Sequence, residues 1–273
     1  MADTIPNDAL LVSASQVANV LTAGADQMDH DENLSITEKR KRKFAHQIGE
    51  HVAPDGKAIA DGYFDTYSDN FSYEEAFEDL FNVEYIVDLI EAIWRSKPSY
   101  KLLDCGSANG LTLKQFHDLG VEAWGIENNA HIHAKTPDEW QDRNLLGNVL
   151  EMPFDDASFD FVYVTCLPYL PEEKIDQAVK EIFRVCRLGV VFQGVTTDMT
   201  EEVIDDYLLF RGLQTFWTFS EWSDAFVRNG FRHAVTDPAL LDEIWRIEQE
   251  TDEDDWNWYP DKESMQYSFF SKS

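Results

Sequence analysis

The residues of this sequence best suited to do chemistry are two glycines and two acids that lie around predicted strand ends. Asp104, Gly106 and Gly110 lie in the run LLDCGSANGL at residues 102–111, and Glu127 follows the next predicted strand. Glycine lets the backbone approach a ligand more closely than any residue with a β-carbon. A carboxylate at the end of a second strand can accept hydrogen bonds from both hydroxyls of a ribose. This spacing predicts a site for a nucleoside-containing ligand.

Two kinds of such ligand compete for this loop. A dinucleotide loop has the pattern G-x-G-x-x-G, whose glycines make room for a pyrophosphate at a helix N-terminus. Here the pattern is D-x-G-x-x-x-G, and Ala108 stands where the middle glycine would be. S-adenosylmethionine has no phosphate, so its amino-acid tail needs a close-approach glycine more than an anion cradle. The loop therefore favours S-adenosylmethionine.

Alternating strands and helices from about residue 100 must position these residues. We expect strands at residues 100–105, 121–126, 159–165 and 188–192, with helices over residues 111–119 and from about Pro171 to Cys186. Strands separated by such helices imply βαβ units, hence a parallel sheet with right-handed crossovers. Open sheets of this kind bind ligands at the carboxyl ends of their strands, where the glycine loop and Glu127 are expected.

The two ends of the chain carry different patterns. Residues 1–95 are predicted to be mostly helical, with Ser35 and Glu38 forming a capping box before the basic run KRKRK at residues 39–43. Towards the C-terminus we expect a helix with Ser220 as its N-cap, a strand at residues 233–235, an acidic segment over residues 238–263 and a last strand around residues 265–270.

The charge of the chain excludes some partners. Its 273 residues include 52 Asp and Glu against 22 Lys and Arg, for a formal charge of -30. Nucleic-acid affinity rests on Lys and Arg that neutralise phosphates, so we expect no nucleic-acid partner and interpret residues 39–43 as a solvated helix face. Halophile surfaces are this acidic, but we favour charge that maintains solubility over a specific cationic partner.

Sequence features also bear on location and metals. No apolar run reaches the roughly 20 residues that span a bilayer, and the start lacks the cationic region of a signal peptide. We therefore expect a cytoplasmic protein with no membrane partner. The three cysteines stand apart, and His131 and His133 share their spacing with no further ligand. We predict no metal site and interpret the two histidines as surface loop residues.

Residues from about 60 to 273 resemble the class I S-adenosylmethionine-dependent methyltransferases. Residues 104–110 resemble the first motif of that family and residues 125–127 its acidic second motif, and NVLEMPF at 148–154 with SFDFV at 158–162 resembles the run before its fourth strand. The resemblance implies a Rossmann-like three-layer α/β/α sandwich with a mostly parallel sheet. It implies a methyltransferase-like core at residues 96–273, preceded by an N-terminal helical lid at residues 1–95.

The resemblance assigns cofactor-binding roles. Asp104 would organise the loop and bind the methionine ammonium, Gly106 and Gly110 would line the tail, and Glu127 would hold the ribose. Asn128 and Val149 would flank the adenine, and Asn148 would meet its exocyclic amine. The family usually has Asp at this last position, and an Asn carbonyl can still accept that hydrogen bond without charge assistance.

Other residues are expected near the sulfonium. Cys166 and Tyr169 lie beyond the fourth strand, where the family often has a histidine, so a histidine base is in doubt. Tyr169 would orient an acceptor or touch the sulfonium, or it is a packing aromatic. Tyr63 and Tyr67 in the lid would lie over the cofactor, because aromatic faces attract cations.

The function implied is a small-molecule methyltransferase that uses S-adenosylmethionine. Two alternatives stay open. One is a cyclase or lyase on the same fold, in which the amine of the cofactor itself displaces methylthioadenosine; the other is a non-catalytic relic that binds cofactor or a partner. The sequence leaves the acceptor and the oligomeric state open.

Overall fold

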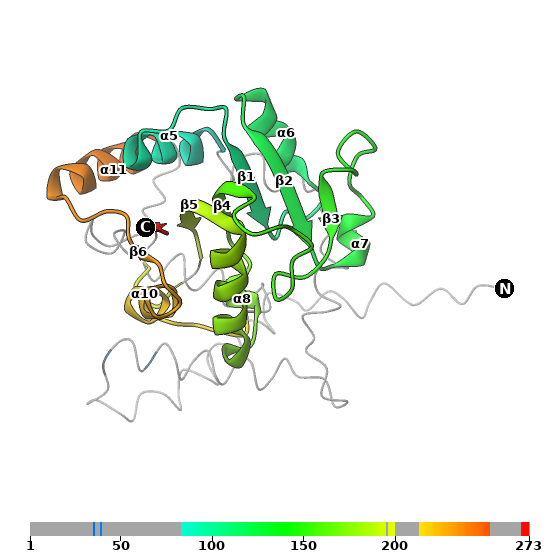
Figure 1. Ribbon diagram of the computed structural model, residues 1–273. Helices are drawn as coiled ribbons and strands as arrows, with labels where there is room; N and C mark the ends of the chain where they lie inside the picture. The colour runs from blue at the N-terminus through cyan, green and yellow to red at the C-terminus, as the bar shows by residue number, and fades with distance from the viewer. Residues whose placement is uncertain are drawn as a thin grey trace, which may run out of the picture.

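The computed structural model describes residues 35, 39, 83–194, 196–199, 213–251 and 269–272. They form one seven-stranded sheet in the order β3-β2-β1-β4-β5-β7-β6 (Figure 1). The strands are β1 (Lys101–Cys105), β2 (Glu122–Glu127), β3 (Asn144–Leu146), β4 (Phe159–Val164), β5 (Cys186–Phe192), β6 (Arg232–His233) and β7 (Phe269–Ser271). Strands β1 to β5 pair in parallel, and β7 runs antiparallel to both β5 and β6. The predicted, mostly parallel sheet is confirmed.

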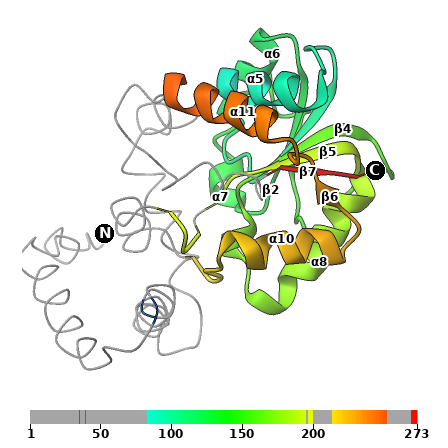
Figure 2. The same cartoon turned by 90° about the vertical axis from the view of Figure 1, so that its left-hand side faces the viewer.

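Helices cover both faces of this sheet. They are α5 (Val83–Trp94), α6 (Leu111–Asp118), α7 (Ala130–His133), the short 3-10 helix η2 (Leu167–Tyr169), α8 (Glu172–Val185), α10 (Phe219–Arg228) and α11 (Pro238–Thr251). Helices α5, α6 and α11 lie on one face, and α8 and α10 lie on the other (Figure 2). The structure is thus the predicted three-layer α/β/α sandwich.

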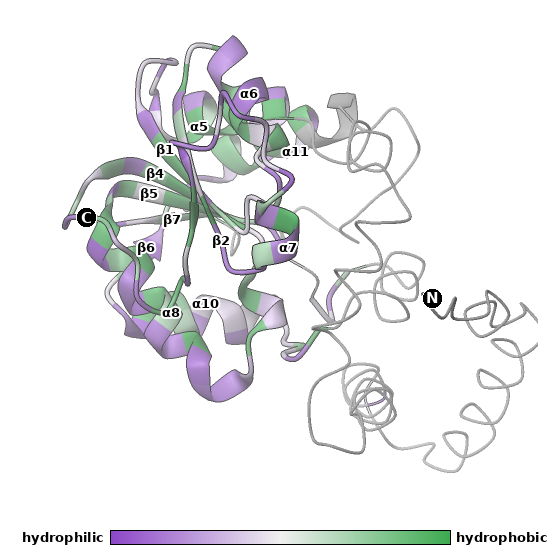
Figure 3. Cartoon of the chain, turned by 90° about the vertical axis from the view of Figure 1, so that its right-hand side faces the viewer, coloured by the Kyte–Doolittle hydropathy of each residue, from purple (hydrophilic) through white to green (hydrophobic). Residues whose placement is uncertain are grey.

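The central strands serve two hydrophobic cores because successive side chains point to opposite faces. Leu102 and Phe161 pack with the buried residues of α5 and α6, whereas Leu103 and Val162 pack with those of α8 and α10. All four are fully buried. Apolar residues accordingly gather along the strands, while α8 presents polar residues on its outer side (Figure 3). Strands buried on both faces are typical of parallel sheets.

Helix α5 is part of this layered core. Its buried residues Ile86, Leu89 and Ile90 belong to the same cluster as those of α6, and α5 packs against α11. The expected boundary at residue 95 assigns this helix to the lid segment, yet it packs as a layer of the sandwich. The rest of that segment, including Tyr63 and Tyr67, lies outside the described residues apart from Ser35 and Lys39.

Several boundaries differ from the sequence expectation. Thr218, and not Ser220, is the N-cap of α10, because Thr218 accepts from the Glu221 amide and the Glu221 side chain accepts from the Thr218 amide. This capping box was readable as T-x-x-E, so the Ser220 prediction was wrong. Cys186 begins β5 directly after α8 instead of ending the helix. Strand β3 and helix α11 had no counterpart in the sequence prediction.

Candidate cofactor-binding site

The turn between β1 and α6 has an unusual backbone. Gly106, Ala108 and Gly110 all have positive φ angles, of 93°, 49° and 77°. Glycine adopts such angles freely, whereas Ala108 does so at a cost of about 1 kcal/mol. A β-carbon at Gly106 would also lie 2.8 Å from the β-carbon of Cys166, which follows β4. Both the conformation and the close approach therefore require glycine at position 106.

Glu127 is joined to this loop, as the sequence predicts for its position. It is the last residue of β2, and its Oε2 accepts from the Ala108 amide at 3.0 Å while Oε1 accepts from the Asn129 amide at 2.7 Å. Burial raises the pKa of Glu127, and these backbone hydrogen bonds oppose the shift. Each carboxylate oxygen has a second lone pair, so both oxygens can still accept a ribose hydroxyl.

Asp104 is the second buried acid at the loop, with only 2% of its surface exposed. One carboxylate oxygen accepts a hydrogen bond from Thr112 Oγ1 on α6. Burial raises the pKa of Asp104 to about 7; the Thr112 hydrogen bond opposes this shift and the charge of Glu127 adds to it. Two neighbouring acids attract the sulfonium and ammonium of S-adenosylmethionine and would repel a pyrophosphate. The residues present therefore fit S-adenosylmethionine.

The segment after β3 carries the residues assigned to the adenine. Val149 is 7% exposed and packs in the same cluster as Ile126, whereas Asn128 and Asn148 are exposed. Asn148 Oδ1 already accepts from the Leu150 amide at 2.9 Å. The carbonyl that would meet the adenine amine thus also holds a local turn.

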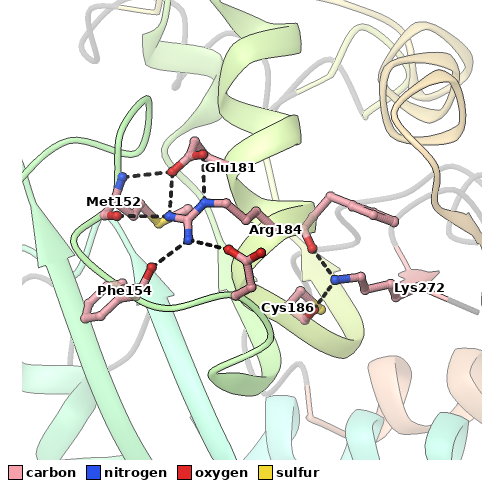
Figure 4. Close-up of polar contacts among 8 residues, drawn as sticks. Met152, Phe154, Glu181, Arg184, Cys186 and Lys272 are labelled. Atoms are coloured by element: carbon pink, nitrogen blue, oxygen red, sulfur yellow. Dashed lines mark hydrogen bonds and ion pairs between the residues drawn. The ribbon is translucent and has the colours of Figure 1, made fainter.

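Helix α8 clamps the chain that follows this adenine segment (Figure 4). Arg184 donates to the carbonyl oxygens of Met152 at 3.0 Å and Phe154 at 2.6 Å. Glu181 accepts from the Met152 amide at 3.0 Å and pairs with Arg184 at 2.8 Å. The carboxylates of Glu181 and Asp156 raise the pKa of Arg184 and keep it charged. Sequence reasoning missed this clamp, because nothing in the spacing of α8 marks the residues that face a distant loop.

The segment after β4 brings Cys166 against the loop but turns Tyr169 into the core. Tyr169 is half-buried in η2 and packs against the hydrophobic core that contains the buried residues of α5 and α6. Burial raises the pKa of the Cys166 thiol, so it stays protonated and is no nucleophile near neutral pH. Next to this segment, Tyr163 Oη donates to Gln193 Oε1 at 2.7 Å, a pair that the sequence analysis did not single out.

The two histidines lie on the short helix α7 and not in a loop. His131 is exposed, whereas His133 is half-buried with Nε2 2.6 Å from the main-chain oxygen of Asn144. A carbonyl only accepts, so Nε2 carries the proton. Among the residues that the structure describes, no group of three or more His, Cys, Asp or Glu side chains could hold a metal ion. In the same part of the chain, no helix is both long and apolar enough to cross a membrane.

The glycine loop has three residues with positive φ angles and lies beside two buried acids, where the parallel strands have their carboxyl ends. This arrangement defines a nucleoside-binding α/β domain of the S-adenosylmethionine type. Comparison with known proteins agrees. Residues 103–192 match a family model described as a methyltransferase domain. The resemblance to the class I methyltransferases is confirmed over these residues, and S-adenosylmethionine is the cofactor of this domain.

Individual relatives are distant. The chain is 31% identical over 135 residues to 24-methylenesterol C-methyltransferase 3 of Arabidopsis thaliana, which covers 45% of this chain and 35% of that protein. It is 26% identical over 146 residues to an uncharacterized protein of Methanocaldococcus jannaschii, covering 52% and 59% of the two chains. A TehB-like SAM-dependent methyltransferase of Corynebacterium glutamicum aligns with a TM-score of 0.45 at 15% identity, over 64% of this chain and 84% of that one. The chain thus spans about a third of the length of the sterol methyltransferase.

Proposed function

We propose that this protein transfers a methyl group from S-adenosylmethionine to a small molecule. The observation that carries the proposal is the pair of buried acids, Asp104 and Glu127, beside a loop of positive φ angles to which Glu127 is hydrogen-bonded, within a match to a methyltransferase domain. When bound, the sulfonium would supply an activated methyl group: an acceptor lone pair would form a bond to the methyl carbon while the carbon–sulfur bond breaks and S-adenosylhomocysteine leaves.

The chain's own residues bind and orient the cofactor. Asp104, when ionised, pairs with the methionine ammonium, while Gly106 and Gly110 let the loop backbone approach the tail. Glu127 accepts hydrogen bonds from the ribose hydroxyls. These contacts hold the reactants in one geometry, which is the main contribution an enzyme makes to a displacement of this kind.

On the adenine side, Val149 supplies an apolar wall. Asn128 lies across the ring from it, and Asn148 meets the exocyclic amine. Beyond β4, Cys166 closes the floor of the site as a neutral thiol, and Tyr169 orients the acceptor or packs beneath it.

The remaining parts of the proposal rest on charge and resemblance. By the resemblance, Tyr63 and Tyr67 would lie over the sulfonium in a lid that precedes α5; both residues lie outside the described part of the chain. The acceptor is a small molecule, because a chain of charge -30 repels nucleic acid. The protein acts in the cytoplasm, without a membrane or nucleic-acid partner. A sterol is named for a relative and is not assigned to this chain.

The test is to incubate the pure protein with S-adenosylmethionine, with and without a panel of small amines, thiols and phenols, and to identify the products by mass spectrometry. Methyl transfer predicts S-adenosylhomocysteine together with an acceptor heavier by one methyl group. Methylthioadenosine released without any acceptor would instead identify the intramolecular cyclase or lyase reaction. A protein that binds cofactor and forms neither product with any acceptor would be the non-catalytic relic.

A further inference from the structure

Asn144, the first residue of β3, lies fully buried beneath the glycine loop. Its Oδ1 accepts from Ser107 Oγ at 2.6 Å. Its Nδ2 donates to the Ala108 carbonyl at 3.0 Å and to Thr136 Oγ1 at 2.8 Å. Both amide hydrogens and the carbonyl oxygen are therefore used. A buried carboxamide with all its hydrogen bonds made has one orientation, because any rotation would leave a polar atom unpaired.

Two glycines make room for this side chain. A β-carbon at Gly110 would lie 3.2 Å from Asn144 Nδ2. At Gly125, a β-carbon would lie 2.5 Å from Asn144 Oδ1 and 2.4 Å from Ser107 Oγ. The glycine loop and β2 thus both approach the carboxamide too closely for a residue larger than glycine at these two positions.

Asn144 and Glu127 together hold the main chain of Ala108. The amide of Ala108 donates to Glu127, and its carbonyl accepts from Asn144, so the peptide groups on both sides of this residue are held. Ala108 is the loop residue whose left-handed backbone is unfavourable without glycine. Without the Asn144 contact, the loop would be free to relax toward ordinary angles.

We propose that Asn144 is a positioning residue that holds the glycine loop in its cofactor-binding conformation before the cofactor arrives. This inference rests on the proposed function for the identity of the ligand. A loop ordered in advance loses less conformational entropy on binding, so affinity rises without any contact between Asn144 and the ligand. His133, which donates to the main-chain oxygen of Asn144, ties α7 to the same point.

The first test measures the loop without any ligand. Hydrogen exchange of residues 106–110 is compared between the wild type, Asn144→Ala and Asn144→Asp. The Asp variant keeps the shape of the side chain and can accept from Ser107, but its carboxylate has no donor for the Ala108 carbonyl. We expect faster exchange in this loop in both variants, with exchange in α8 and α10 unchanged. Exchange at the wild-type rate in both would overturn the proposal.

The second test measures affinity for S-adenosylhomocysteine and S-adenosylmethionine by calorimetry. Loss of a loop-holding hydrogen bond should weaken binding about tenfold in Asn144→Ala and Asn144→Asp. Thr136→Val removes only the partner remote from the loop, so its affinity should change less than about threefold. Wild-type affinity in both Asn144 variants would also overturn the proposal.

A matched control separates positioning from general destabilisation. Ser223→Ala removes another buried hydroxyl, which lies 3.1 Å from His233 Nε2 on the far side of the fold from β3. It should lower thermal stability while leaving cofactor affinity and loop exchange as in the wild type. Equal losses of affinity in Ser223→Ala and Asn144→Ala would show that Asn144 affects binding only through the general stability of the fold. A wild type that binds neither ligand would refute the proposed function, and the exchange data would still decide whether Asn144 holds the loop.

Discussion

The loop after β1 and the segment after β4 meet at one edge of the sheet, where Gly106 faces Cys166, but they are held in different ways. The loop is fixed by polar contacts of Glu127 and Asn144. The segment after β4 is fixed by the burial of Leu167, by turns of its own backbone, and by hydrogen bonds that its main-chain carbonyls accept from Gln214 and Thr215.

The difference indicates a division of labour. Directed hydrogen bonds set the positions of donors and acceptors, which suits recognition of one invariant cofactor. In the segment after β4, an apolar anchor and hydrogen bonds to main-chain carbonyls fix the course of the backbone and involve no charged side chain, which suits a wall that faces an acceptor. We therefore expect changes at the loop to alter cofactor affinity most, and four variants test where that dependence begins and ends.

The largest effect is expected from Gly106→Ala, which disturbs both the glycine loop and the segment after β4. The substitution combines a left-handed backbone with a β-carbon 2.8 Å from Cys166, and should lower the free energy of unfolding by about 2 to 4 kcal/mol and abolish cofactor binding. Urea unfolding and calorimetry would measure these losses. Gly120→Ala is the control, because Gly120 is also left-handed but its nearest neighbour would be 3.6 Å away. Adding Cys166→Gly should restore only the steric share; no recovery would show that the close approach between the two segments is unimportant.

Glu127→Ala tests the polar side alone. Loss of hydrogen bonds to a charged group should weaken S-adenosylhomocysteine binding by about 1.5 to 3 kcal/mol in calorimetry. Glu122→Ala, at the opposite end of β2 and paired with Lys101 at 3.4 Å, should bind as the wild type does. Equal affinity in the two variants would remove Glu127 from the ribose site.

The raised pKa of Asp104 predicts how binding depends on pH. Below pH 7 the carboxyl becomes protonated and can no longer pair with an ammonium, so affinity should fall by up to about tenfold for each further pH unit. Asp104→Asn should bind weakly, with an affinity that changes less between about pH 5.5 and 8 than that of the wild type.

The same group affects stability. In the ligand-free protein, the Asp104 carboxyl of the folded state holds more protons than that of the unfolded chain between pH 3.8 and about 7. This carboxyl should therefore make unfolding easier as pH rises through that window. A profile shared by the wild type and Asp104→Asn would assign the titration to another group.

The smallest effect is expected on the adenine side, where Arg184 holds the chain after the adenine segment and is not itself expected to contact the cofactor. Arg184→Lys keeps the charge but replaces the planar guanidinium, whose nitrogens serve two carbonyls and Glu181 together, with a single ammonium nitrogen, so binding of S-adenosylhomocysteine should weaken by about 1 kcal/mol. Arg228→Lys, at an exposed pair with Asp176, controls for loss of an arginine and should leave affinity unchanged. If both variants bind like the wild type, the clamp on α8 serves stability and not the cofactor.

The sequence by itself determined the parts whose evidence is local. Strands β1, β2, β4 and β5, helices α6 and α8, the glycine loop and the placement of Glu127 follow from short contiguous patterns, because periodicity and strand-to-helix turns are encoded within a few residues of each other. Strand β3 and helix α11 were not predicted in this way. The S-adenosylmethionine preference followed from the missing middle glycine, and the two buried acids agree with it.

Only the tertiary structure decided what lies beneath and behind that loop. Asn144 reaches Ala108, and Arg184 reaches Met152, from segments separated along the chain, and nothing in their own neighbourhoods marks them. Helix α5 likewise became a layer of the sandwich through its packing against α6 and α11. Such contacts depend on which surfaces the sheet brings together, so no local pattern in the sequence marks them.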